Sequence, residues 1–284
     1  MPNTRDIRRR IKSVQSTRQL TKAMKMVSAA KLRRSQERML AARPYARLMQ
    51  QVLRSLAARA NPESHPLLAK RPEERIELVV MTADKGLCGS FNTNILKRAQ
   101  SFLLERGVKT RALHCVGKKG RDFFRRRKIP IAREYVDVFR TIETRQAAEI
   151  ARDLIARFTE GELDAVYLIY NEFKSVIQQR VIVDRLIPIE REEFGEGAAR
   201  EDYLYEPDPA ALFEELLPRH IEVQVYQAML ESAAAEHGAR MAAMDAATSN
   251  AGEMIESLTL FLNRVRQASI TKEIIEVVSG AQAL

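Results

Sequence analysis

The stretch "RMAAMDAATSNAGEMIESLTLFLNRVRQ", residues 240–267, decides the fold of this chain. Its apolar and small residues recur at alternating steps of three and four, which keeps them on one face of a helix. Sustained over several turns, this heptad pattern is typical of a helix packed lengthwise against another helix in a coiled coil. The pattern comprises Met241, Met244, Thr248, Ala251, Ile255, Leu258, Leu262 and Val265, then shifts phase and resumes at Ile270, Ile274, Val277 and Ala281.

The other end of the chain supplies a helix of matching length. Residues 4–60 contain no glycine, and Pro44, their one proline, predicts a kink or a local break. The apolar residues fall into helically spaced sets that are out of phase with one another, so we expect the apolar stripe to wander around this helix without forming one straight seam. The sets are Ile7, Ile11 and Val14; Leu20, Met24 and Val27; and Tyr45, Met49, Val52 and Leu56.

Length indicates what the two terminal helices do. A helix of about 60 residues is roughly 90 Å long, which is far more than a compact domain of this 284-residue chain would span. Frequent Ala and Ser allow close approach, so we predict an antiparallel two-helix coiled coil built from the N- and C-terminal segments. Pro218 is expected to divide a short entry helix, capped by Asp208 and Pro209, from the long C-terminal helix.

The segment between these helices changes character. Runs typical of strands alternate here with runs typical of helices; the strand-like runs are 76–83, 111–116, 130–136 and 163–170, and the helix-like runs are 93–107, 120–128 and 144–161. Residues 174–189 are expected to form a strand that returns antiparallel, as a hairpin at the edge of the sheet. Such alternation predicts a Rossmann-like α/β domain with a mainly parallel sheet. The expected organisation is an N-terminal helix over 1–60, a linker over 61–75, the α/β domain over 76–190, a loop over 191–208 and a C-terminal helix over 209–284.

Charge is distributed unevenly along the chain. The first 60 residues hold 16 Lys or Arg against Asp6 and Glu37, whereas residues 209–284 hold 5 basic and 10 acidic residues. The two ends therefore attract each other, and the N-terminal helix keeps excess positive charge for an acidic partner. No apolar run is long enough to span a bilayer, and Cys88 and Cys115 lack the spacing of metal ligands. These features predict a reduced, cytosolic protein.

Two other functions, binding of a phosphate group and binding of nucleic acid, are open to these residues. The turn "TADKGLCGSFN", residues 82–92, could bind phosphate after a strand, but it matches neither the dinucleotide fingerprint nor the Walker A pattern. "GKKGRD", 117–122, is similarly unspecific, and His114 is better explained as a packed core residue than as a base. The basic helix could bind nucleic acid, yet aromatic residues do not interleave with its arginines, so a solvated or partner-facing surface is favoured. No catalytic residue, cofactor or metal site is predicted.

The terminal segments carry a resemblance. The chain resembles the gamma-subunit family of the F-type ATP synthases in three segments. These are "IRRRIKSVQSTRQLTKAMKMVSAAKLRRSQ", "DKGLCGSFN" and the C-terminal run through Ile270, Thr271, Glu273, Glu276 and Gly280. The resemblance implies a non-catalytic central rotor that couples proton flow through a membrane c ring to conformational cycling of catalytic beta subunits. It also implies alpha, beta, epsilon and c-ring partners, no nucleic acid, and a peripheral place on the cytoplasmic face of a bacterial plasma membrane.

The same resemblance implies contact residues for the catalytic ring. Those near an acidic beta-subunit loop would be Lys22, Met24, Lys25 and Val27, and those making polar contacts would be Arg266, Gln267, Thr271 and Glu273. An apolar tail formed by Val277, Val278, Ala281 and Leu284 would lie in a bearing at the top of the ring. Chloroplast relatives carry an insertion with a regulatory cysteine pair. Because Cys88 and Cys115 are far apart in this sequence, no thiol switch of that type is expected.

Overall fold

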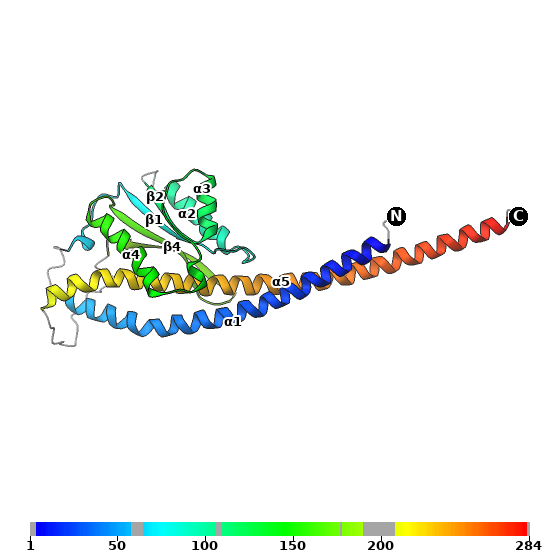
Figure 1. The fold of residues 1–284 in the computed structure, drawn as a ribbon, viewed down its shortest axis with the longest axis horizontal. Helices are drawn as coiled ribbons and strands as arrows, with labels where there is room; N and C mark the ends of the chain where they lie inside the picture. Colours follow the sequence, from blue (N-terminus) through cyan, green and yellow to red (C-terminus); the bar gives the residue numbers. More distant parts are fainter. Residues whose placement is uncertain (1–3, 58–64, 106–109, 177, 190–207, 283–284) are drawn as a thin grey trace. The chain divides into compact units, whose positions relative to one another are not determined.

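The computed structural model describes residues 4–57, 65–105, 110–176, 178–189 and 208–282 (Figure 1). The chain divides into two compact units, which we call the coiled-coil unit (residues 1–28 and 240–284) and the α/β unit (residues 29–239). Helix α1 (Thr4–Ala57) and helix α5 (Pro209–Gln282) each contribute a segment to both units. None of the described helices is long and apolar enough to cross a membrane.

One sheet organises the described part of the α/β unit. Its five strands lie in the order β3-β2-β1-β4-β5. The first four are parallel to their neighbours, and β5 pairs antiparallel with β4, as the predicted hairpin edge requires. The strands are β1 (Ile76–Met81), β2 (Thr110–Val116), β3 (Ile131–Tyr135), β4 (Ala165–Phe173) and β5 (Gln179–Ile187).

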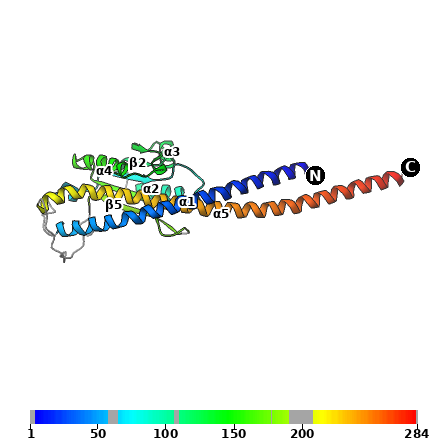
Figure 2. The same ribbon diagram turned by 60° about the horizontal axis from the view of Figure 1, so that its bottom comes forward.

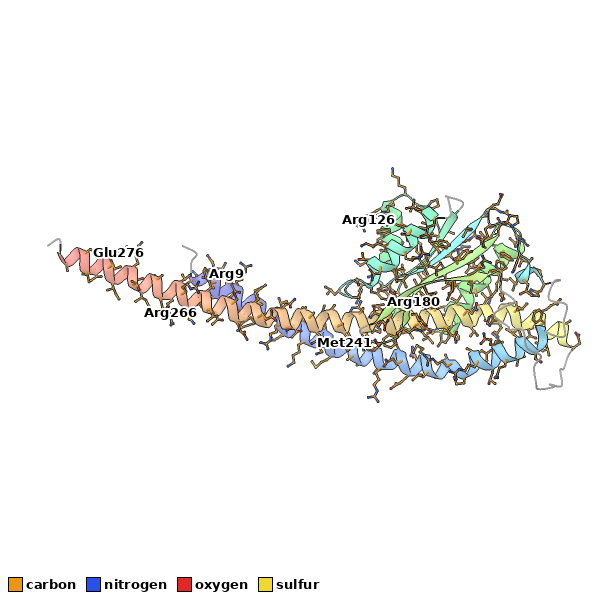
Figure 3. The ribbon with its side chains drawn as sticks, turned by 180° about the vertical axis from the view of Figure 1, so that it is seen from behind. Arg9, Arg126, Arg180, Met241, Arg266 and Glu276 are labelled. Atoms are coloured by element: carbon orange, nitrogen blue, oxygen red, sulfur yellow. The ribbon has the colours of Figure 1, made fainter. Side chains whose placement is uncertain are left out.

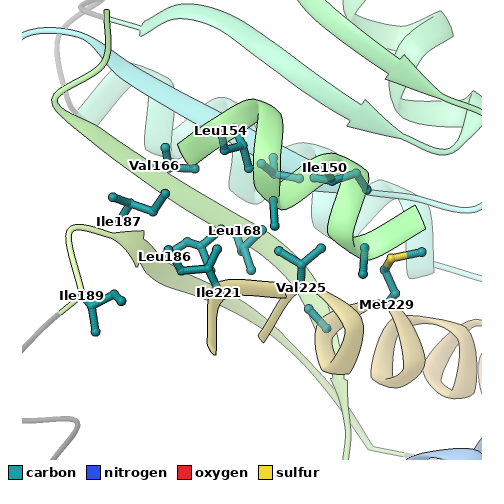
Figure 4. Close-up of a cluster of buried hydrophobic side chains, with 14 of the residues drawn as sticks. Ile150, Leu154, Val166, Leu168, Leu186, Ile187, Ile189, Ile221, Val225 and Met229 are labelled. Carbon is teal, nitrogen blue, oxygen red and sulfur yellow. The ribbon is translucent and has the colours of Figure 1, made fainter. Parts of the chain in front are cut away.

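Helices cover both faces of this sheet and create a core on each. Helices α2 (Phe91–Glu105) and α3 (Lys118–Arg126) bury residues such as Phe91, Ile95 and Phe124 against one face. Helix α4 (Thr144–Thr159) and the first part of α5 pack on the other face. Figure 4 shows Ile150 and Leu154 of α4 opposite apolar side chains of β4, β5 and α5. Short 3-10 turns, η2 (Pro66–Leu68) and η3 (Val138–Arg140), complete the described elements.

Helix α1 corrects the expectation of a wandering stripe. Leu20 and Val27, assigned to that stripe, are 61% and 57% exposed. Most of the buried and half-buried positions instead follow one pattern of alternating steps of three and four along the helix, interrupted by exposed Arg18. Most of the positions missed from the sequence are small or polar, so an apolar pattern does not reveal them. The seam comprises Thr4, Ile7, Ile11, Val14, Thr21, Lys25, Ser28, Leu32, Ser35, Met39, Ala42, Ala46, Met49, Leu53 and Leu56.

A local break at Pro44, which was one of the two alternatives predicted there, and a division at Pro218 are also wrong. Helix α1 continues through Pro44 and helix α5 continues through Pro218. Pro44 is exposed and lies between the seam positions Ala42 and Ala46, so its ring does not displace the packed face. A proline inside a helix removes one backbone hydrogen bond, and packing along the seam holds the helix together across that gap.

In α5 the predicted heptad positions from Met241 to Val265 are all buried or half-buried. The predicted change of phase is different in the structure: Ser269 continues the seam, whereas Ile270, Ile274 and Val277 are exposed. The predicted loop over 191–208 lies outside the described residues except for its last residue. Taken together, the elements confirm the predicted fold class, which combines long terminal helices with a Rossmann-like α/β domain.

Candidate partner-binding surface

The coiled-coil unit is held together by small and polar side chains as well as by apolar ones. Its two helices lie side by side and antiparallel in both views (Figures 1 and 2). The hydroxyl oxygens of Thr21 and Thr248 are 2.7 Å apart, and Lys25 Nζ donates to Asp245 Oδ1 at 2.6 Å. Thr and Ser at seam positions let the backbones approach closely while their hydroxyls find partners, such as the Met24 carbonyl for Ser28. The seam therefore fixes the register of the pair.

That register leaves the end of α5 without a partner from α1. Because Thr21 lies opposite Thr248, Thr4 falls opposite about residue 265 in an antiparallel pair. Ser269 is half-buried, and every side chain over 271–279 is exposed. Figure 3 shows Glu276 on this part of α5, past the end of α1 that carries Arg9. The last turns of α5 are thus available to another protein.

The exposed end of α5 carries several large apolar side chains beside the charged residues Lys272, Glu273 and Glu276. Five of its Ile and Val side chains are between 49% and 72% exposed; they are Ile270, Ile274, Ile275, Val277 and Val278. Ala281 is exposed as well, and Leu284 lies outside the described residues. A run of exposed large apolar side chains is typical of a protein–protein interface. This segment, 270–281, is called the apolar tail below.

The predicted basic contacts on α1 do not form one face. Met24 and Lys25 are half-buried at the seam, and Lys25 is paired with Asp245 inside the chain. Lys22 and Val27 are exposed on either side of the seam. The described part of α1 in this unit carries eight Lys or Arg and a single Asp, so it still presents excess positive charge around the helix.

The predicted polar contacts lie elsewhere on the unit. Arg266 and Gln267 are exposed where α1 ends, and Figure 3 labels Arg266 there. The Thr271 hydroxyl donates to the Gln267 carbonyl at 3.0 Å, and the Ser269 hydroxyl donates to Glu273 at 3.3 Å. About 20 residues of α5, or roughly 30 Å, separate this group from the one around Lys25. The two predicted groups are therefore separate contact regions along one helix pair.

Sequence reasoning missed several exposed apolar residues on this unit. Met26 of α1 and Met254, Leu260 and Phe261 of α5 are between 41% and 68% exposed. The sequence indicates that these residues are exposed, because each is an apolar residue that lies outside the heptad positions of its helix. An apolar residue that a coiled coil does not bury is available to a partner.

The amides of the second candidate turn, 117–122, are already paired with atoms of the first candidate turn, 82–92. Lys118 N–H donates to Asp84 Oδ1 at 2.9 Å, Lys119 N–H to the Ala83 carbonyl at 3.1 Å and Gly120 N–H to Thr82 Oγ1 at 2.8 Å. These are the amides at the start of α3 that a phosphate would need. The first candidate turn leads from β1 into α2, and its hydrogen bonds hold the start of α3 beside the carboxyl end of β1, which is a role in the fold.

Other candidate chemical groups are likewise part of the core. His114 is fully buried, as predicted, and its Nε2 lies 2.9 Å from Glu77 Oε1. The second oxygen of Glu77 accepts from Arg157 at 2.6 Å. Burial raises the pKa of the Cys115 thiol to about 12. Because the thiolate is the reactive form of cysteine, Cys115 is chemically inert at neutral pH.

Known proteins match the chain over its whole length. The ATP synthase family model matches residues 3–284. Two proteins named ATP synthase gamma chain are similar to this chain. The one from Anaeromyxobacter sp. (strain Fw109-5) is 53% identical over 290 residues, and the one from Solibacter usitatus is 54% identical over 287 residues. They match all of this chain and 100% and 99% of their own lengths.

Solved structures agree with this assignment. A chain of the Tetrahymena thermophila mitochondrial ATP synthase, from a structure of the central stalk and c-ring, is 28% identical with a TM-score of 0.62. It covers 80% of this chain and 99% of its own length. A chain of the Euglena gracilis mitochondrial ATP synthase has a TM-score of 0.70 at 20% identity. It covers 99% of this chain and 94% of its own length, and at this identity it supports the fold alone. The chain therefore belongs to the gamma-subunit family of the F-type ATP synthases, the family of the central stalk.

Proposed function

We propose that this gamma subunit is the turning shaft that couples proton flow through a membrane c ring to ATP synthesis on the catalytic beta subunits. In this role it transmits torque and performs no chemistry, and in reverse it lets ATP hydrolysis drive proton pumping. The observation that carries the proposal is the apolar tail, which extends past the end of α1 with its Ile and Val side chains exposed.

The apolar tail suits a rotating contact with the alpha and beta ring. Contacts of Val277, Val278, Ala281 and Leu284 with an apolar sleeve would be non-directional, so the tail would be held sideways at every angle. A fixed salt bridge at the same place would favour one angle and oppose the next. The physical character of the exposed residues thus supports a bearing.

The charged parts of the coiled-coil unit would meet the ring at lower levels. Lys22, with Met24, Lys25 and Val27 beside it, would face acidic loops of the beta subunits. Exposed charges attract such loops over a distance close to the Debye length, about 8 Å at physiological salt. Arg266 and Gln267 would make polar contacts just before the apolar tail, and Thr271 and Glu273 would make them within its first turn. These assignments rest on exposure, on charge and on the family resemblance.

The α/β unit would be the part that joins the epsilon subunit and the c ring. Membership of the complex would hold the chain peripherally on the cytoplasmic face of the bacterial plasma membrane, since its relatives at 53% and 54% identity are bacterial. The Tetrahymena relative comes from a structure of a central stalk with a c-ring, which is the basis for naming that partner.

Removing residues 270–284 from the subunit in the reconstituted synthase tests the proposal. We expect ATP-driven proton pumping into vesicles to fall more than fivefold, while the α/β unit keeps its circular dichroism spectrum and melting temperature. The matched control is Leu104→Ala on α2, which removes an exposed apolar side chain from the other unit. Pumping unchanged by the truncation would contradict the bearing.

A further inference from the structure

A small cavity of the α/β unit is lined by cations from two different elements. It lies between α1, the η3 turn and α5, and has a volume of about 220 Å³. Lys31, Arg34 and Arg38 of α1 line it together with Arg140 of η3. Among the described residues that line the cavity there is no carboxylate. Four positive charges thus surround one opening without an acidic residue in its wall.

These four cations are not neutralised within the described part of the chain. Their side chains make no hydrogen bond or ion pair there, in contrast to neighbouring Arg33, which pairs with Glu37 at 3.0 Å. All four side chains are exposed, so their charge is available to a ligand. Like charges held close together repel one another, and a bound anion would remove that repulsion.

The backbone fixes the arrangement before any ligand binds. Lys31, Arg34 and Arg38 are spaced i, i+3 and i+7, which places them on one face of α1. Arg140 ends a 3-10 turn that begins after Asp137, and the Asp137 N–H donates to Asp84 at 3.1 Å. The cations are therefore held on two anchored elements, so less conformational entropy is lost on binding.

The rest of the wall indicates the kind of anion. Ser35 and Thr141 add hydroxyl groups and His237 adds an imidazole, whereas buried Ile142 and Leu230 form an apolar floor. Guanidinium groups match the geometry of phosphate oxygens in paired hydrogen bonds. The volume is smaller than the roughly 300 to 1,000 Å³ of pockets that enclose drug-sized ligands, so a compact anion fits better than an entire nucleotide.

We propose that this cavity binds a phosphate-class anion, either inorganic phosphate or diphosphate or the phosphate tail of a nucleotide that leaves its base outside. The site lies in the α/β unit and involves none of the residues assigned to the catalytic ring above. Its existence is independent of the rotor proposal, because binding by the subunit alone does not require rotation.

Calorimetric titration of the purified full-length subunit with inorganic diphosphate in 150 mM chloride tests the site. We expect one anion bound per chain. The double variant Arg34→Gln/Arg38→Gln should bind at least tenfold more weakly, and Arg140→Gln alone should weaken binding at least threefold from a different element. The matched control is Arg180→Gln, the same charge removal at an exposed position of β5 (labelled in Figure 3), which should stay within twofold.

Further ligands separate the possible sources. ATP binding about as tightly as diphosphate would support recognition of the phosphate tail, and inorganic phosphate alone saturating the site would support a free-anion site. ATP binding more than tenfold tighter than diphosphate would overturn the inferred ligand size. The proposal fails if diphosphate does not saturate below millimolar concentration, if the three arginine variants all bind diphosphate equally well, or if an acidic peptide binds where diphosphate does not. Melting temperatures of the variants within about 2 °C of the parent would show that each remains folded.

Discussion

At the scale of single residues, Asp164, just before β4, is hydrogen-bonded to the segment just before β1. Its side chain is 5% exposed and accepts hydrogen bonds from the backbone N–H groups of Glu74 and Arg75. The Arg75 guanidinium adds two more, of which the shorter is 2.6 Å. The hydrogen bonds from Arg75 lower the pKa of Asp164. The residue connects the segment before β1 to the segment before β4.

Replacing Asp164 with Asn should destabilise the subunit by about 2–4 kcal/mol at pH 7, because a buried partner of Arg75 is lost. The folded pKa is depressed, so the stabilisation is present above the unfolded pKa of about 3.9 and is lost as the pH falls through the folded value. Urea unfolding at pH 7 and at the lowest pH where the protein stays folded measures both effects. A difference in stability that does not shrink with acid would contradict this account.

Glu231 gives the opposite dependence on pH. Burial raises its pKa, and its Oε2 atom is buried without a hydrogen-bond partner among the described residues. Because the folded pKa is raised, the contribution to stability is full below the unfolded pKa of about 4.3 and is lost as the pH rises through the folded value. Glu231→Gln should therefore stabilise the subunit by about 1 kcal/mol at pH 7 and by less at pH 4. Thermal unfolding at both pH values measures this, with Glu215→Gln as the exposed control.

At the scale of elements, the seam of α1 explains how one helix can pass through a proline. The seam positions on both sides of Pro44 are packed, and the proline itself is exposed. The same seam admits Thr21, Ser28 and Ser35, whose polar side chains would be unfavourable in a fully apolar core. Small size at the contact is thus more important to this helix than apolar character.

Pro44→Ala should stabilise α1, because it restores a backbone N–H that can donate to the Leu40 carbonyl and replaces a poor helix former. A proline in a helix interior costs about 3 kcal/mol relative to alanine, so we expect a gain of about 1–3 kcal/mol in unfolding free energy by urea titration. Ala41→Pro, also at an exposed position of α1, is the reverse substitution and should destabilise. Equal stability of all three proteins would show that α1 tolerates proline without cost.

At the scale of the whole molecule, the two units differ in what they bury. The α/β unit has an apolar core on each face of its sheet, whereas the coiled-coil unit leaves the apolar tail exposed. The first unit buries its large apolar side chains within itself, and we propose that other subunits cover those left exposed on the second. One unit with its own buried core and one with exposed apolar side chains would suit a central-stalk subunit.

A charge placed in the apolar tail should disturb function without disturbing the fold. Val277 is 72% exposed, so Val277→Glu is not expected to change the melting temperature of the isolated subunit. In the assembled synthase the carboxylate would have to be desolvated in an apolar sleeve, and we expect ATP-driven proton pumping to fall more than fivefold. Val277→Ala is the matched control and should remain within twofold. Equal proton pumping by both variants would show that Val277 does not contact an apolar surface in the assembled synthase.

Much of the fold followed from patterns local in sequence. The heptad from Met241 to Val265 predicted the long helix and its buried face, and the alternation of strand and helix predicted the parallel sheet with its antiparallel edge. These features depend on periodicity, which a sequence displays directly. The resemblance at both chain ends likewise led to the family to which the chain belongs.

Packing decided what the patterns could not. The wandering stripe in α1, a local break at Pro44 and a division at Pro218 were wrong predictions, because small polar residues opposite a matching helix can be buried and both helices continue through their prolines. The convergence of Lys31, Arg34 and Arg38 with Arg140 was also invisible, since about 100 residues separate them. The sequence by itself determined which elements form and which family they belong to. The tertiary structure decided which faces they bury, because burial depends on the partner that each face meets.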